Sequence, residues 1–157
     1  MKRIALFARV SNESQASEDR HSIPAQIEFM RERCQREGWE VVKEYVAPGE
    51  SAFTGVLSKR PTLARAVKDA QDGCFDALMI HESSRLARNE RLAHEILDTL
   101  HEAGVSLICA DSPIDFATAE GRVYFGVQQD LNAYWSRKMA EHITKGKRKQ
   151  FSLGLPV

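Results

Sequence analysis

Residues 3–11 read RIALFARVS, an apolar run that ends in an arginine and a serine. The part from Arg3 to Arg9 has the length and aliphatic content of a strand buried inside a sheet. Ligands of open α/β sheets bind outside the carboxyl ends of the strands. We therefore expect Arg9 and Ser11 at a ligand-binding edge, facing the same side because residues i and i+2 of a strand share a face.

Strand and helix patterns alternate along the chain after this first strand. Ser22 is expected to cap the first helix and Gly38 to end it. Repeated strand–helix units with apolar strands are typical of a parallel sheet covered by helices on both faces. The sequence thus predicts an α/β, three-layer fold with strands over residues 3–9, 40–46, 76–81 and 105–110 and helices over 22–38, 61–72 and 90–103.

Residues 47–59 form a polar connection that carries two glycines and a proline. A loop of this length inside a small domain is usually functional or mobile. We expect it to approach the same edge of the sheet as the end of the first strand.

A different pattern begins near residue 119. Apolar residues recur every four positions up to residue 143, at Val127, Leu131, Trp135, Met139 and Ile143. A helix over 119–150 would be about 45 Å long, which exceeds the width of a small domain. The apolar stripe either packs on its own sheet or dimerises with a second copy, and its length favours dimerisation.

Composition restricts the class of protein. The chain has 157 residues, with 43% hydrophobic and 28% charged, values that suit one globular domain. Cys34, Cys74 and Cys109 form no CxxC pair and predict reduced thiols in a cytoplasmic protein. The N-terminal apolar run is too short for a signal peptide, and no stretch is long enough to span a membrane.

Charge is unevenly distributed. The net charge is 0, yet residues 137–149 hold six cations and one anion, so the remaining residues sum to −5. A solvated helix end explains such cations, because they suit a helix C-terminus. A segment that follows DNA phosphates explains them equally well. The cations in question are Arg137, Lys138, Lys145, Lys147, Arg148 and Lys149.

Four arginines are expected at one edge of the sheet. Arg9 ends the first strand, Arg85 and Arg88 follow the third, and Arg60 closes the loop after the second. Arginine forks match phosphate oxygens and stay charged. No metal constellation is expected, because the five histidines are scattered and no HExxH or CxxC occurs.

Taken together and in order, these motifs resemble the serine recombinases, the resolvase/invertase family. The chain is most similar to the large serine integrases and transposases, over nearly its whole length. The resemblance rests on ARVS at 8–11 with Gln15, SIPAQ at 22–26, GW at 38–39, PGESA at 48–52, KRP at 59–61, FD at 75–76, SRLARN at 84–89 and YWSR at 134–137.

The resemblance implies a resolvase-like catalytic domain over 1–150. In that family role, Ser11 attacks a DNA backbone phosphate and becomes joined to the 5′ phosphate, while Arg9, Arg85 and Arg88 hold that phosphate. Gln26, Ser51 and Arg60 belong to the surrounding site. A tetramer would exchange the ends of double-stranded DNA and religate them, with no cofactor, metal, membrane or small-molecule substrate. DNA contacts are expected from Arg137, Lys145, Lys147, Arg148 and Lys149. Residues 151–157 are expected to form the start of a linker to a DNA-binding domain.

Two acids of the family pattern are missing from this chain, and Phe7 stands where the family commonly has a tyrosine. The family usually has an aspartate where Ser84 stands and often an acid where Ala47 stands. Glu50 is a candidate for the second missing acid, and Glu82 or Asp111 for the first. The general base for Ser11 is not identified by the sequence. The alternatives to an active enzyme are a catalytically decayed assembly module and a small nucleotide-binding α/β domain, although the chain has no glycine-rich phosphate loop.

Overall fold

The computed structural model describes residues 1–10, 22–52, 54–112 and 118–152, and in the last range it leaves out the side chains of 129, 132 and 146–152. Ser11, the expected nucleophile, lies outside the described residues. The strands are β1 (Arg3–Val10), β2 (Glu40–Pro48), β3 (Ala77–Ile80) and β4 (Ser106–Cys109). They pair in the order β2-β1-β3-β4, and every pair is parallel.

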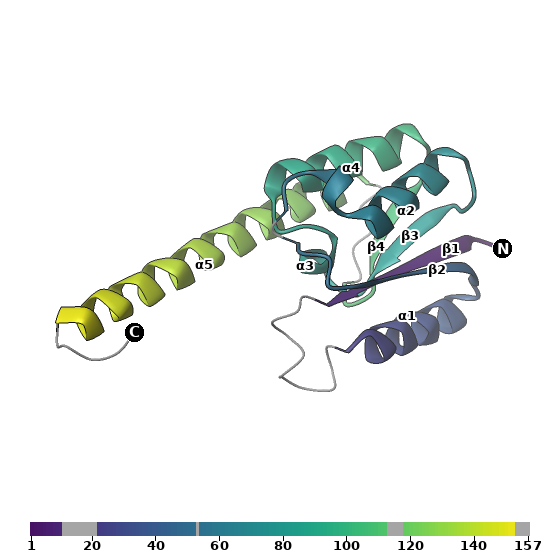
Figure 1. The fold of residues 1–157 in the computed structure, drawn as a ribbon. Helices are drawn as coiled ribbons and strands as arrows, with labels where there is room; N and C mark the ends of the chain where they lie inside the picture. Colours follow the sequence, from purple (N-terminus) through teal and green to yellow (C-terminus); the bar gives the residue numbers. More distant parts are fainter. Residues whose placement is uncertain (11–21, 53, 113–117, 153–157) are drawn as a thin grey trace.

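Helices cover both faces of this sheet. Helix α1 (Ile23–Glu37) lies on one face, and α2 (Pro61–Gln71) and α4 (Glu90–Glu102) lie on the other (Figure 1). Residues of β1 alternate between the two layers: Ile4 and Leu6 pack with α1, while Ala5 and Phe7 pack with α2 and α4. The predicted three-layer parallel α/β fold is confirmed. By the same alternation Arg9 falls on the face covered by α2 and α4.

The predicted signals at the ends of α1 are confirmed. The Ser22 hydroxyl accepts a hydrogen bond from the Ala25 amide at 3.3 Å. Gly38 ends the helix with a φ of 67°, the left-handed conformation that glycine adopts without steric cost. These local rules fix where α1 begins, and so they set the position of Gln26 in its first turn.

Two short elements were not predicted. The loop after β2 contains a 3-10 turn, η3 (Leu57–Lys59), and a single helical turn, α3 (Ser83–Leu86), follows β3. One-turn helices carry no hydrophobic periodicity, so the sequence pattern does not reveal them. Helix α3 matters for the site because it carries Arg85 at the carboxyl edge of the sheet.

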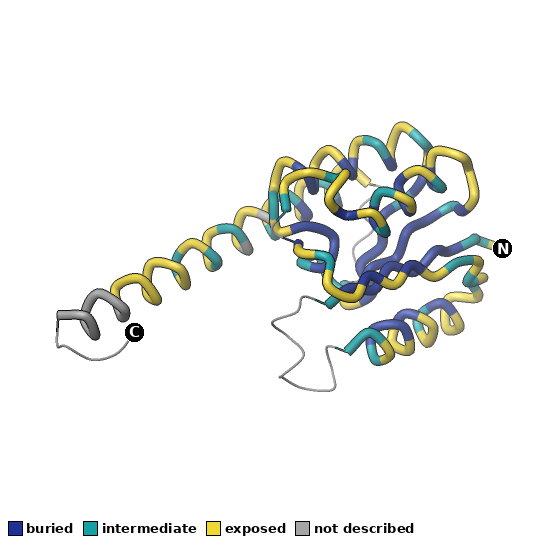
Figure 2. Tube along the Cα trace, viewed as in Figure 1, coloured by how far each residue is buried: buried dark blue, intermediate teal, exposed yellow. Residues whose placement is uncertain are grey.

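The long helix α5 (Ala119–Ser152) projects from the body of the domain (Figure 1). Gly121 and Phe125 near its start are buried, and Phe125 joins the core that contains Leu86. Farther along, the apolar stripe predicted from the sequence is exposed, as Figure 2 shows for the projecting part. The same-chain reading of that stripe is therefore wrong for the projecting part. The helix also extends two residues into the segment 151–157 that was expected to begin a linker.

Within the described ranges, no helix combines the length and apolar character needed to cross a bilayer.

Candidate active site

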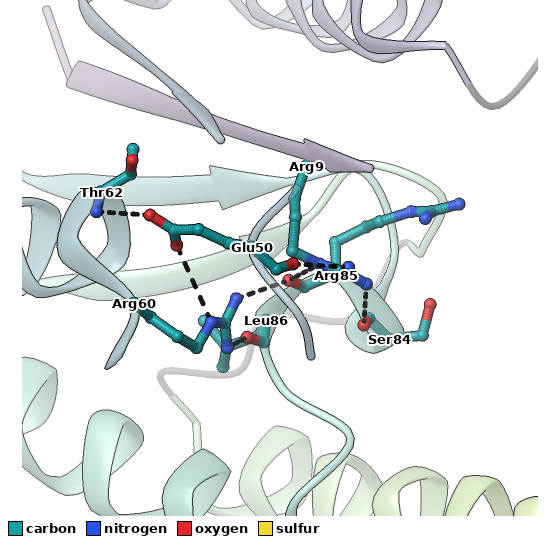
Figure 3. Close-up of polar contacts among 7 residues, drawn as sticks. All are labelled: Arg9, Glu50, Arg60, Thr62, Ser84, Arg85 and Leu86. Carbon is teal, nitrogen blue, oxygen red and sulfur yellow. Dashed lines mark hydrogen bonds and ion pairs between the residues drawn. The ribbon is translucent and has the colours of Figure 1, made fainter. Parts of the chain in front are cut away.

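Arginines from three separate segments meet where β1, β2 and β3 end (Figure 3). Arg9 comes from β1, Arg60 directly precedes α2, and Arg85 belongs to α3. Arg60 is 0% exposed, Arg9 1% and Arg85 7%. Fully buried arginines are rare unless their donors are satisfied, so their partners define what each one does.

The guanidinium of Arg9 is bonded to main-chain carbonyls of two other segments. Its Nε donates to the Arg85 oxygen at 3.2 Å, and its Nη2 donates to the Ser84 oxygen at 3.3 Å. Its Nη1 donates to the Glu50 oxygen at 3.0 Å. One side chain thereby connects the end of β1 to α3 and to the loop that follows β2 (Figure 3).

Gln26 holds the main chain of Arg9 from the opposite face of the sheet. Its Oε1 accepts from the Arg9 amide at 3.3 Å, and its Nε2 donates to the Arg9 carbonyl at 3.0 Å. Gln26 is 0% exposed, so it acts here by fixing the position of the strand end. This clamp lies two residues before Ser11.

Arg60 is the second connector. Its Nη1 donates to the Leu86 carbonyl and its Nη2 to the Arg85 carbonyl at 3.5 Å. Its Nε lies 3.9 Å from Oε2 of Glu50. The other carboxylate oxygen of Glu50 accepts from the Thr62 amide at 2.6 Å, in the first turn of α2. Glu50, one of the acids considered from sequence, is therefore placed inside the arginine cluster.

Arg85 and Arg88 occupy the outer part of the cluster. Oε1 of Glu82 lies 3.1 Å from Nη2 of Arg85. Arg88 is exposed, and its amide donates to the Ala52 carbonyl at 2.8 Å, which fastens the loop carrying Ser51 to the end of α3. Ser51 is exposed beside Glu50. Of the two acids that the sequence left open for Arg85, Glu82 makes the ion pair.

The cluster is electrostatically strained by its own like charges. The pKa of Arg9 is lowered to about 10, first by burial and then by the nearby charges of Arg85, Arg60 and Arg88, with Glu82 acting in the opposite sense. Burial also lowers the pKa of Arg60, and Glu50 opposes that change. An added anion would relieve this repulsion, as a phosphate does.

The remaining predicted residues lie elsewhere or outside the described part. Arg137 and Lys145 are exposed on the projecting part of α5. The side chains of Lys147, Arg148 and Lys149 are outside the described residues, as is Ser11. The structure therefore brings together Arg9, Gln26, Ser51, Arg60, Arg85 and Arg88, and of the described α5 cations it does not gather Arg137 and Lys145 with them.

One contact near the site was not anticipated from sequence. Nη1 of Arg33 in α1 lies within hydrogen-bond distance of three carbonyls after β4, at 2.6 Å from Cys109, 3.0 Å from Ala110 and 2.6 Å from Ser112. Arg33 thus holds the segment that leads to Asp111. An arginine on an amphipathic helix has the pattern of a solvated residue, so no sequence signal distinguished it.

This fold, with arginines at the carboxyl edge of a parallel sheet and a long exposed helix, defines the class of protein. The chain belongs to the resolvase N-terminal domain family, whose model matches residues 4–154. The family predicted from the sequence motifs is therefore confirmed.

Individual relatives agree with this assignment. The chain is 28% identical over 157 residues to a putative DNA recombinase of Bacillus subtilis (strain 168), covering 98% of this chain but only 29% of that protein. Among solved structures it is similar to the N-terminal catalytic domain of TP901-1 integrase, with a TM-score of 0.68 and 24% identity over 88% of this chain and 98% of that one. A resolvase family site-specific recombinase from Streptococcus pneumoniae has a TM-score of 0.65 and 24% identity, with 97% and 99% covered.

Proposed function

We propose that this chain is the catalytic domain of a serine recombinase that breaks and rejoins double-stranded DNA. Ser11 Oγ forms a bond to a backbone phosphorus, and the bond from that phosphorus to the 3′ oxygen breaks. The serine proton leaves and the 3′ oxygen gains one, so a 5′-phosphoserine and a free 3′ hydroxyl result. Attack by a 3′ hydroxyl reverses the step, and neither a metal nor a nucleotide is consumed.

The observation that carries this proposal is the convergence of four guanidinium groups two residues from Ser11. Phosphoryl transfer depends mainly on positioning and on stabilising charge at the phosphoryl oxygens. Arginine is the side chain best suited to hold those oxygens without a metal. Burial is the main cause that lowers the pKa of Arg9, and the charges of Arg85, Arg60 and Arg88 are close enough to lower it further.

The burial of each arginine suggests a division of roles. Arg88 is exposed and Arg85 lies at the outer side of the cluster, so these two meet the phosphate first. Arg60 and Gln26 keep the strand end and α3 in place through main-chain contacts. Arg9 reaches the phosphate by exchanging a carbonyl contact for a phosphate oxygen, and Ser51 borders the same space.

The two carboxylates in the cluster favour an active site over a decayed one. Ser84 and Ala47 lack the acids usual at these positions, which motivated the alternative of a non-catalytic assembly module. Glu82 and Glu50 place carboxylates beside Arg85 and Arg60 instead. The arginine cluster thus keeps carboxylate partners although the usual acids are missing.

The exposed stripe of α5 is proposed to pack against a second copy, giving a dimer and, on paired DNA sites, a tetramer. Trp135 and Met139 are each 66% exposed, which is unusual for large apolar side chains on one helix. Arg137, Lys145, Lys147, Arg148 and Lys149 are proposed to follow DNA phosphates beside that interface. The catalytic domain then spans 1–150, and residues after it lead to a separate DNA-binding module.

The test is capture of the covalent intermediate. The complete protein that carries this chain is incubated with sheared genomic DNA of its source, and adducts are isolated by precipitation in detergent and potassium. We expect mass spectrometry to find the nucleotide on Ser11, and we expect capture to persist in EDTA. Ser11→Ala should abolish it, whereas the matched control Ser14→Ala should not. Equal capture by Ser11→Ala would exclude the proposed nucleophile, and loss of capture in EDTA would exclude a metal-free reaction.

A further inference from the structure

Glu82 occupies the junction between β3 and α3, one residue before the helix begins. This is the N-cap position of α3, yet its side chain makes no capping hydrogen bond to the turn. The carboxylate instead turns toward α3's own side chains. Its Oε1 accepts a hydrogen bond from the Ser84 hydroxyl at 2.6 Å and lies 3.1 Å from Nη2 of Arg85.

The two partners differ in exposure. The Arg85 side chain is 8% exposed, whereas that of Glu82 is 31% exposed. An ion pair between exposed residues three apart contributes little to stability. For a nearly buried guanidinium the ion pair matters more. Removal of the opposite charge leaves a charge with little solvent around it, which is destabilising. The carboxylate is therefore well placed to fix Arg85 while remaining in contact with the open side of the cluster.

A third residue fixes Glu82 itself. The Ser84 hydroxyl bonds the same carboxylate oxygen that faces Arg85, and the Ser84 carbonyl accepts from Arg9. The orientation of Glu82 is thus tied to the main-chain turn that Arg9 holds. The pKa of Asp111 is raised, first by burial and then by the charge of Glu82. Glu82 is accordingly the acid that contacts Arg85, and its charge also acts on Asp111.

We propose that Glu82 is a positioning residue that orients the Arg85 guanidinium toward the DNA phosphate, with the Ser84 hydroxyl holding the carboxylate in place. This inference rests on the proposed function, because the reaction is where the orientation of Arg85 takes effect. Small displacements of a group that holds the reacting atoms reduce rates strongly. The carboxylate acts through Arg85 and does not contact the DNA.

The experiment measures the single-turnover rate of Ser11 adduct formation in the complete protein. Its substrate is a nicked duplex built from the sequence captured by the wild type. We expect Glu82→Gln to slow the step about 10- to 100-fold while retention of the duplex on a filter stays within about twofold. Because Ser84 Oγ lies 2.6 Å from Glu82 Oε1, an aspartate at 84 brings a carboxylate to nearly the same place. The double variant Glu82→Gln/Ser84→Asp should therefore regain at least about tenfold in rate.

The matched control is Glu95→Gln, an exposed acid of α4 outside the cluster, which should react at the wild-type rate. A Glu82→Gln protein that reacts within about twofold of wild type overturns the inference, as does a folded double variant as slow as Glu82→Gln. If Glu82→Gln does not fold, Glu82→Asp replaces it. A slower rate in that folded variant supports the inference, and an unchanged rate overturns it.

Failure of the proposed function gives a different result. If the wild-type protein forms no Ser11 adduct, both the proposed function and this inference are contradicted. If the wild type forms the adduct and the Glu82→Gln variant forms it at the same rate, only the inference about Glu82 is contradicted.

Discussion

Glu50 and Arg60 face each other inside the arginine cluster, with 3.9 Å between the carboxylate Oε2 and the guanidinium Nε (Figure 3). Among the described residues, neither of these two buried atoms has a hydrogen-bond partner. The attraction between them is therefore electrostatic at a distance too long for a hydrogen bond. Because the other oxygen of Glu50 caps α2 at Thr62, the pair fastens the loop after β2 to the edge of the sheet.

The first prediction concerns this pair. Glu50→Gln keeps an acceptor for the Thr62 amide but leaves Arg60, whose side chain is 0% exposed, without its opposite charge. We expect the free energy of unfolding in urea to fall by about 3 kcal/mol. Glu28→Gln, an exposed acid of α1, is the control and should unfold like the wild type. Equal stability of the two variants would show that Glu50 does not offset the charge of Arg60.

The second prediction separates the inner and outer arginines. Arg88→Ala removes an exposed side chain, so the free energy of unfolding should change by less than about 0.5 kcal/mol. Arg9→Ala removes three donors to main-chain carbonyls that are buried or partly buried, and should cost about 2–3 kcal/mol. Both variants should lose at least about 100-fold in adduct formation, because each removes positive charge at the transition state. Urea unfolding and the capture assay check the two halves. An Arg88→Ala protein with normal capture would remove Arg88 from the site.

The third prediction concerns acid stability where α2 packs on β2. Asp69 accepts from Lys43 Nζ and from the Tyr45 hydroxyl, each at 2.5 Å, and these contacts hold its pKa below the ordinary 3.8. Because the folded pKa is lowered, the contribution to stability is present above pH 3.8 and is lost as the pH falls through the folded pKa. Asp69→Asn should therefore flatten part of the fall in unfolding free energy below pH 4, as measured by urea titration at several pH values. A pH profile identical to wild type would contradict this.

The fourth prediction tests self-association through α5. Trp135→Ser with Met139→Ser replaces two exposed apolar side chains and should weaken association at least about tenfold in sedimentation experiments. The thermal stability of the domain should be unchanged, since these residues lie beyond the part of α5 that packs on the core. Glu141→Ser, two residues from Met139 and on another side of the helix, should associate normally. If the double variant also associates normally, the stripe is not the interface.

Much of the fold was predictable from local rules. The alternation of apolar runs with helical periodicity identified each of the long strands and helices, and Ser22 and Gly38 marked the ends of α1. Helix α3 was not predicted because four residues make only about one turn, which is too short for a periodic pattern to repeat. The predicted extent of α5, residues 119–150, was nearly right. The uninterrupted four-residue spacing of apolar residues indicates a continuous helix but does not say at which residue it ends.

The candidate site was likewise predictable only in part. Arg9, Arg60 and Arg85 were recognised from their places after strands or beside the loop, and the structure does bring them together. Their main-chain partners were not recognised. The main-chain carbonyls of Glu50, Ser84 and Arg85 that accept from Arg9 have no side-chain signature at all.

By itself, the sequence determined the parallel sheet, its layers, the edge where the arginines gather and the family, because each depends on periodicity, short motifs or strand direction. Only the tertiary structure decided which carboxylate meets which arginine. Glu82 rather than Asp111 pairs with Arg85, and Glu50 stands against Arg60. The physical reason is the separation of the partners along the chain. Helix caps and periodic faces involve neighbours within a few residues, whereas Arg9 and its partner carbonyl in Arg85 are 76 residues apart. Such contacts depend on ångström-scale packing of segments that the chain brings together only when the whole core has formed.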